Sequence, residues 1–446
     1  MSKAPEINNP VGTYLTIDGE KIFFNITLIN KKENIPLPID NFIELIIEED
    51  LNSPFYKGVL RVKNDKNRFD LQAVPTTQKN FNFIETGENF ISIEINKNNI
   101  SKLYVFFIVE ETISVENGEK VKNIYIEDAY LYRLRNDRSL FSTTNLLQGD
   151  VTQLSDNDRQ VNVSDAIQNL LQTSFDGNNI TEDLWAKSSN KTSFTSNLKQ
   201  SRLEALDFLL DKAIDTNSNS LFLFKRNNSF ELRSINDLFV DNLAAKIKNN
   251  FGGNFTLVNE QMQSEQMPQV LSTKVTDFTV YNENSLHTLE QLLNHKVIRY
   301  DFNSKKFDFF NSDNTIDNTL NHIKDKFLNK RTTVNRESND RVSKNILYKI
   351  IYTTNSDVDS SRYEGRNTIL KNLISLSTML SYKCKGIYNI APGQFINTFY
   401  NTAIPNKHSK KLNGSWMVVG YKHTFTINTF YSEIACTKFH ELIEDI

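Results

Sequence analysis

The stretch from Gly414 to Phe439 most constrains the fold, because two runs rich in β-branched and aromatic residues flank a polar break at Thr426–Thr429. This pattern predicts an antiparallel hairpin. Successive side chains of a strand point to opposite faces. The first run should therefore carry Val419, Tyr421, His423 and Phe425 on one face and Trp416, Val418 and Gly420 on the other. Both faces hold apolar groups, so we expect a hairpin covered on each side, as in a closing barrel or an assembly wall.

Length and charge narrow the class of protein. The 446 residues predict roughly two to four domains. Hydrophobic residues make up 39% and charged residues 24%, which is typical of a folded soluble protein. The 54 acidic and 51 basic residues nearly cancel, so the net charge of −3 gives no general reason to expect a nucleic-acid or anionic membrane partner.

Cysteine use and hydropathy point to a protein made in a cytoplasm. The two cysteines, Cys384 and Cys436, lie in strand-like apolar runs, so we expect buried free thiols and no disulfide framework. The N-terminal residues lack the apolar core of a signal peptide. No stretch reaches the ~18–20 apolar residues of a membrane span, so no membrane insertion is expected.

Residues 1–145 are predicted to form a first antiparallel β-barrel. Short strands follow one another with little helix, and Asp18-Gly19 and Asn117-Gly118 are typical of hairpin turns. The segment from Ile124 to Leu134 is expected to be the last of these strands.

Residues 146–250 are predicted to be an inserted α/β domain. Apolar residues follow Ser164 at helical spacing, with Ser164 as the expected N-cap. A second helix begins at Ser201, where Glu204 completes a capping box. Two strands, 220–225 and 229–234, complete this domain.

The remaining chain is predicted to return to β-structure. Residues 251–310 are strands that belong to or lead into a second barrel, with a short helix at 285–293. Residues 311–344 are a polar connecting arm, and residues 345–446 form the second tube-like barrel, with a helix at 366–381. The predicted fold class is α+β and β-dominated, with two antiparallel tube-type β-barrels and an inserted α/β domain. The order of the parts suggests an internal duplication of barrels.

Taken together, several segments resemble the central hub protein of contractile phage baseplates of the T-even type. Related folds occur in the spike proteins of type VI secretion and in the late-control proteins of P2-like phages. The segments that carry the resemblance, in this order, are Ile46–Leu60, Lys191–Ser196, Ser201–Ala213, Leu221–Phe224, Phe230–Ile235, Ile390–Ile396, Leu412–Val419, Lys422, His423 and Tyr431. Residues 311–345 have no counterpart in that family.

The resemblance implies two tube-like barrels in each chain and a homotrimer with pseudo-sixfold symmetry. Such a trimer joins the hexameric ring of the tail tube to the trimeric central spike, and three subunits can present six similar surfaces only if each contains two similar domains. The implied partners are the spike protein, the tail tube ring and the baseplate wedge proteins. Genomic DNA would be in contact only in transit, and the implied location is the baseplate of the virion.

The residues do not suggest an enzyme. None of the six histidines has a metal-binding spacing; His287 and His295 lie eight residues apart, and His423 on a covered strand is expected to be a structural imidazole. The acidic groups at 48–50, 110–111 and 127–128 are interpreted as solvated strand ends or outer faces. We therefore predict no catalytic, cofactor-binding or metal-binding residue and no cofactor.

Two other readings stay open. A carbohydrate- or receptor-binding tail protein would use exposed aromatic residues such as Trp185 or Trp416, and an enzyme on a β-scaffold is the weakest alternative. Basic residues at Lys407–Lys411 and Lys324–Arg331 are interpreted as solvated loops, with docking to an acidic partner or contact with passing DNA as the functional alternative.

Overall fold

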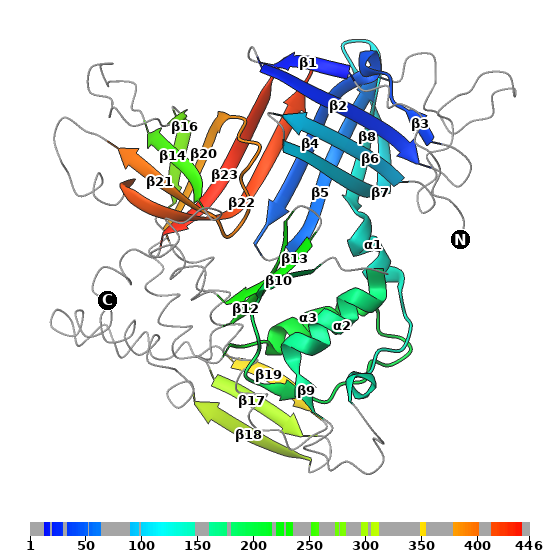
Figure 1. Cartoon of the computed structure of the whole chain (residues 1–446), viewed down its shortest axis with the longest axis vertical. Coiled ribbons are helices and arrows are strands. Elements are labelled where there is room, and N and C mark those ends of the chain that lie inside the picture. Colours follow the sequence, from blue (N-terminus) through cyan, green and yellow to red (C-terminus); the bar gives the residue numbers. More distant parts are fainter. Residues whose placement is uncertain are drawn as a thin grey trace, which may run out of the picture.

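A computed structural model gives the arrangement of the chain (Figure 1). The residues that it describes are 13–17, 20–29, 34–51, 53–63, 90–97, 100–147, 160–175, 180–215, 220–226, 229–234, 251–257, 273–275, 277–281, 296–301, 305–311, 348–353, 378–400 and 412–438. The expected helix at 285–293, nearly all of the arm at 311–344, and both basic clusters lie outside these residues.

One 15-stranded sheet dominates the protein and divides into two lobes. The first lobe contains β1 (Thr13–Ile17), β2 (Glu20–Ile29), β3 (Asn34–Pro36), β4 (Phe42–Asp50), β5 (Ser53–Lys63), β6 (Phe90–Lys97), β7 (Ile100–Glu116) and β8 (Glu119–Asp128). The second contains β14 (Phe251–Leu257), β15 (Thr273–Val275), β16 (Asp277–Tyr281), β20 (Thr378–Lys385), β21 (Phe395–Tyr400), β22 (Gly414–Thr426) and β23 (Phe430–Lys438). The lobes lie side by side in the upper part of Figure 1.

The expectation of two separate closed antiparallel barrels needs correction. Strand β22 pairs with β4, so the strands of both lobes belong to one continuous sheet. Strand β14 also runs parallel to both β15 and β21, so the sheet is mainly but not wholly antiparallel. The β-dominated α+β class is confirmed.

A smaller α/β unit lies below the sheet in Figure 1. Its helices are α1 (Ala129–Asn136), α2 (Val163–Phe175) and α3 (Arg202–Lys212), and its strands are β9 (Val161–Asn162), β10 (Ile180–Trp185), β11 (Lys191–Thr192), β12 (Leu221–Arg226) and β13 (Ser229–Ser234). Short 3-10 turns occur at η1 (Ile39–Asn41) and η3 (Thr143–Leu146). A separate sheet contains β17 (Lys296–Asp301), β18 (Lys306–Asn311) and β19 (Tyr348–Thr353).

The helix predictions of the α/β unit are partly confirmed. Ser201 and Glu204 form the predicted capping box of α3. Ser164 is not an N-cap, because it lies inside the first turn of α2, where its hydroxyl accepts a hydrogen bond from the backbone of Ser188. The expected strand 124–134 ends at Asp128, whose side chain caps α1 by accepting from the Tyr130 N–H.

The predicted helix at 366–381 also needs correction at its end. Thr378–Ser381 belongs to strand β20 and not to a helix. Leu380 has helical spacing from earlier leucines, but it is buried in the core of the second lobe and lies opposite Cys436 on β23. The pairing of this segment with β23 therefore determines its conformation, although the spacing of its leucines is typical of a helix. Cys384 and Cys436 are both free and buried, as predicted.

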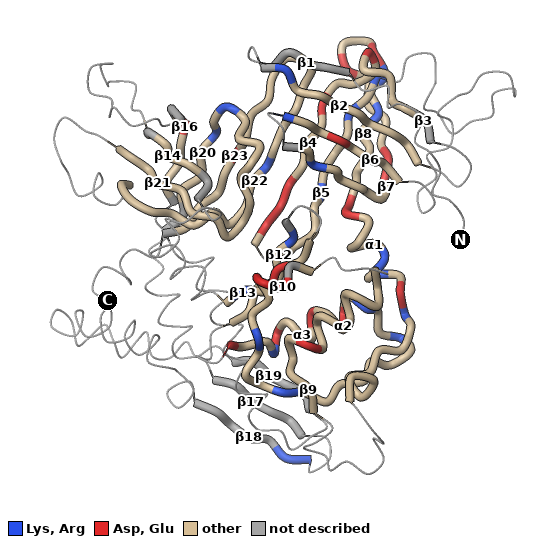
Figure 2. Tube along the Cα trace, in the orientation of Figure 1, with Lys and Arg blue, Asp and Glu red and all other residues tan. Residues whose placement is uncertain are grey.

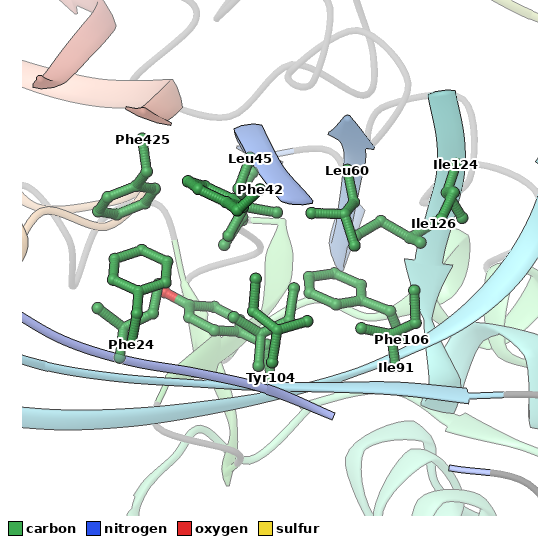
Figure 3. Packing of buried hydrophobic residues seen from close by; sticks show 14 of the residues in the cluster. Phe24, Phe42, Leu45, Leu60, Ile91, Tyr104, Phe106, Ile124, Ile126 and Phe425 are labelled. Carbon is green, nitrogen blue, oxygen red and sulfur yellow. The ribbon is translucent and has the colours of Figure 1, made fainter. Parts of the chain in front are cut away.

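Separate hydrophobic cores fill the lobes. The first core packs aromatic and aliphatic side chains between the strands, and Phe425 from the second lobe meets Phe24 within it (Figure 3). The second-lobe core includes Trp416 and Ile434. A junction core joins both lobes to the α/β unit and consists of Leu51, Phe222, Phe224, Phe395 and Met417.

A β-bulge in β22 alters the predicted faces of the hairpin. The register shifts between Val418 and Gly420, so alternation reverses at Val419. As a result Trp416 and Val418 share the second-lobe core with Tyr421, while Val419 packs against the junction core. The predicted grouping of Val419 with Tyr421 is wrong for this reason.

Candidate assembly surface

The two lobes meet along β4 and β22, which pair from Gly420 opposite Asp50 to Thr426 opposite Glu44. One face of this junction covers the cores. The opposite face, which we call the outer face, carries residues such as Lys422 and Glu48, whose side chains are 38% and 53% exposed. The expectation of a hairpin covered on each side therefore holds for one face of β22 and only partly for the other.

A row of alternating charges crosses the outer face from one lobe to the other. Each member lies directly opposite the next on a neighbouring strand. Lys422 Nζ lies 3.8 Å from a Glu48 carboxylate oxygen, and the acidic end of β4 lies beside a basic segment of β22 in Figure 2. The charge row, in order from β16 to β8, is Asp277, Lys383, Glu433, Lys422, Glu48, Lys57 and Glu127.

The charge row favours this strand register. Opposite charges on directly opposed residues attract, and a register slip of two residues on β22 would remove Lys422 from between Glu48 and Glu433. Glu127, at one end of the row, also pairs with Arg135 on α1 at 2.9 Å. The row therefore ties the two lobes together across the junction.

A second row, two residues along, consists mainly of small side chains. Its members are Thr279, Ser381, Ala435, Gly420, Asp50 and Ser53, each opposite the next. A cleft of about 580 Å³ lies over this row, and Phe55, Lys57 and Glu433 also line it. The small side chains leave this part of the outer face hollow.

Buried ion pairs correct the prediction that the acidic groups are all solvated. Asp128 and Lys225 have side chains only 1% and 2% exposed, and their oxygen and nitrogen are 2.5 Å apart. Glu111 pairs with the buried Lys122 at 2.6 Å. Glu49 is also buried. The burial of Glu49 could have been predicted from the alternation of side chains along a strand, because Glu49 falls on the same face of β4 as the buried Leu45 and Ile47.

The Glu49 carboxylate accepts a hydrogen bond from Tyr421 across the lobe junction. Burial raises the pKa of the Tyr421 hydroxyl, and the negative charge of Glu49 adds to this effect. Nearby, Lys102 Nζ donates to the carbonyl of Tyr388 at 2.7 Å and lies 4.7 Å from the centre of its ring. Burial lowers the pKa of Lys102 to about 8, partly opposed by Glu49.

His423 is the structural imidazole that was predicted. The Ser432 hydroxyl accepts from the Ile387 N–H at 3.0 Å and shares a hydrogen bond with His423 Nδ1 at 2.8 Å. The other ring nitrogen, Nε2, has no hydrogen-bond partner among the described residues. Burial, with the nearby charges of Lys102 and Lys97, lowers the pKa of His423 well below its usual value.

The other candidate residues do not form a site. Trp416 is fully buried, and its indole N–H donates to the Leu412 carbonyl at 3.3 Å. Trp185 packs against the core of the α/β unit. His287 and His295 lie outside the described residues. Within the part of the chain that the structure describes, no three His, Cys, Asp or Glu side chains converge on a metal position, and no helix is long and apolar enough to span a membrane.

Comparison with known proteins finds similarity in structure only. No protein-family model matches the chain, and no curated protein matches it. A tail protein from Neisseria meningitidis is similar over 93% of this chain and 96% of its own, with 8% identity and a TM-score of 0.49.

Two further solved structures show comparable similarity. The 43 kDa tail protein of prophage MuSo2 from Shewanella oneidensis has a TM-score of 0.48 and 9% identity, over 94% of this chain and 98% of its own. An E. coli component of the type VI secretion system, itself similar to the T4 tail proteins gp27 and gp5, has a TM-score of 0.42 and 9% identity, over 93% and 77%. These matches to tail and secretion proteins describe overall arrangement and say nothing about the activity or partners of this chain.

Proposed function

We propose that the chain is a structural hub at the centre of a phage tail baseplate or a related injection machine. In this proposal three copies form a symmetry adaptor that joins the hexameric tail tube to the trimeric central spike. The observation that carries the proposal is the pairing of β4 with β22, which fixes two sheet lobes rigidly within one chain. Three such chains hold six lobes, which is what a threefold body needs to meet a sixfold ring.

The strand pairings support a tube-type character for the lobes. In the second lobe the pairings run from β22 through β21 and β14 to β15, and from β16 through β20 and β23 back to β22. Only Thr276 separates β15 from β16. The proposed divisions are 1–145 and 345–446 for the tube-like domains, 146–250 for the α/β insertion, 251–310 for strands of or leading into the second, and 311–344 for a connecting arm.

The charge row supports a passive wall and not a nucleic-acid binding site. Positive and negative side chains alternate along it, so it offers no continuous basic track for phosphates. If DNA passes through the trimer, a wall of this kind would not retain it by counterion release. The proposed partners are the spike, the tail tube ring and the wedge proteins, and the proposed location is the virion tail.

Mass measurement in the presence of the spike tests this function. The full chain, co-expressed with the spike protein and the tail tube protein of the same phage, is expected to yield a complex with three copies of the chain. Light scattering and native mass spectrometry would measure the stoichiometry. A chain that stays monomeric with both partners present would contradict the proposal.

The competing reading, a glycan- or receptor-binding tail protein, gains no support from the tryptophans. Trp416 offers no exposed ring face for sugar stacking, and Trp185 is only partly accessible. A glycan array with the full chain separates the two readings, because specific retention of one sugar would favour the receptor-binding role. The proposed hub is expected to show none.

A further inference from the structure

The cleft over the small-residue row lies where the two lobes and the α/β unit meet. Its lining comes from β4, β5, β20, β22 and β23, and it includes Phe55, whose ring packs against Phe230 of the α/β unit at 6.1 Å. Within the described residues no segment fills its volume of about 580 Å³. It is therefore a hollow in an otherwise regular sheet face, shared by distant parts of the chain.

The cleft is deep along this row because the side chains at its base are small. Gly420 lies at the centre of the row, between Asp50 on β4 and Ala435 on β23. A Cβ atom at Gly420 would lie 3.1 Å from the Glu49 carbonyl oxygen, which is tighter than about nine in ten Cβ contacts, so a side chain here would force a small shift. Ser53 and Ser381 continue the floor on either side. A bound chain could therefore approach the sheet closely along this row.

The charges that line the cleft are unequal. Three residues with outward-facing carboxylates, Glu48, Asp50 and Glu433, line the cleft against two with ammonium groups, Lys57 and Lys422, while the Glu49 carboxylate is turned inward to Tyr421. Glu433 and Glu48 lie on strands separated by β22, which places their backbones about 10 Å apart at the usual strand spacing. Acidic groups are thus distributed along the cleft.

This distribution selects the kind of ligand. Among the described residues the carboxylates do not converge tightly enough to hold a metal ion. Separated carboxylates instead complement separated cations on one chain, and three residues of extended peptide span about 9–10 Å, which matches their spacing. An anionic ligand would meet repulsion from the carboxylate excess.

We propose that this cleft binds an extended segment of a partner protein that carries Lys or Arg at about every third residue. The cations would pair with Glu48 and Glu433 along the edge of the cleft, while the backbone of the segment lies over Gly420 and Ala435. The carboxylates would then act as charge-assisted acceptors, which are stronger than neutral ones. This proposal is independent of the trimer stoichiometry, and either can fail without the other.

Peptide binding by the full chain tests the proposal. The probe is an eight-residue fluorescent peptide with lysine at every third position separated by serines, and the comparison is the same peptide with glutamate in place of lysine. Fluorescence anisotropy should detect binding of the lysine peptide only. Raising the salt concentration from about 0.05 to 0.5 M should weaken it, because screening shortens the reach of partly exposed charges.

Two variants locate the binding. The double substitution Glu48→Gln with Glu433→Gln should weaken binding at least about tenfold, because it replaces two charged acceptors with neutral ones. Ala435→Phe fills the cleft without changing its charge and should also abolish binding. The matched control is Glu182→Gln with Asp183→Asn, which removes two exposed carboxylates on β10 and should leave binding unchanged. Thermal melting confirms that each variant folds.

Three outcomes would overturn the proposal. The first is no binding of the lysine peptide at about 1 mM, and the second is equal binding of the glutamate peptide. The third is binding that survives both cleft variants, which would place it elsewhere. A fourth result would also overturn it: the chain binds no peptide but self-associates, and Ala435→Phe abolishes the self-association. That result would mean that the cleft binds a second copy of the chain and not a partner protein.

Discussion

Lys225 Nζ lies 2.5 Å from Asp128 Oδ2, and this contact joins the α/β unit to the end of the first lobe. Lys225 is on β12, and Asp128 ends β8 and caps α1. The ammonium group also lies 4.2 Å from the ring centre of Tyr130 and 5.0 Å from that of Tyr56. Charge, aromatic faces and a helix cap therefore meet at one point between two parts of the chain.

Removing one member of this pair should strongly destabilise the protein. Lys225→Met leaves the buried Asp128 carboxylate without its countercharge, and breaking such a pair costs about 3–5 kcal/mol. Denaturant unfolding, with fluorescence and circular dichroism as probes, measures the loss. The control is Lys63→Met, whose exposed pair with Glu119 should be worth less than about 1 kcal/mol. Equal losses in the two variants would contradict the importance of burial.

Charge reversal within the charge row should weaken the lobe junction by a smaller amount. Lys422→Glu places a carboxylate directly between Glu48 and Glu433, and such like-charge pairs cost about 0.2–1 kcal/mol each. Lys422→Gln removes the attraction without adding repulsion and should fall between this variant and the natural protein. Melting temperatures of the three proteins at low salt give the order. A Gln variant less stable than the Glu variant would argue against the charge row.

The stability of the chain should rise with pH where Lys102 loses its proton. The pKa of Lys102 is about 8 in the folded chain and about 10.4 when unfolded. Between these values the unfolded state binds more protons, so stability increases with pH, while below pH 8 the buried charge remains a cost. Lys102→Met removes the effect. From pH 8 to pH 10 the natural protein should gain unfolding free energy relative to Lys102→Met, as the cost of its buried charge disappears, and a pH-independent difference between the two proteins would refute the prediction.

Acid should destabilise the protein partly through His423. Its pKa lies well below the value of about 6.5 that it has when unfolded. As the pH falls through 6.5 the unfolded state gains a proton that the folded state does not, so stability falls. His423→Phe, placed among Tyr421, Phe425 and Phe430, should make the loss between pH 7 and pH 5 shallower. Unfolding curves at these pH values check the slope.

Local pattern was enough to predict much of the secondary structure. The terminal hairpin, strands β12 and β13, strand β21 and the capping box of α3 all depend on residues close in sequence. Alternation and capping are short-range effects, which a single sequence carries. The fold class followed from the same signals.

The remaining features depend on contacts between distant residues. The partner of Asp128 lies 97 residues further along the chain, so nothing local indicates that this carboxylate is buried. The pairing of β4 with β22 joins segments whose paired residues are 370 (Gly420 and Asp50) to 382 (Thr426 and Glu44) positions apart, and it replaces two expected separate barrels with one sheet. The bulge at Val419 adds one unpaired residue to β22, so the side chains that follow it point to the opposite faces from those predicted. The charge row could be recognised only after the register was known.

Strand β22 is a wall common to both lobes. Its early residues pair with β21, its later ones pair with β4, and β23 pairs with it from Met417 to Phe425. Exchange of one lobe alone with that of a related protein would remove a neighbouring strand from β22 and expose the backbone edge of the strand left behind. The shared strand therefore makes each lobe part of the other's support, so neither can be exchanged without rebuilding the pairing of β22.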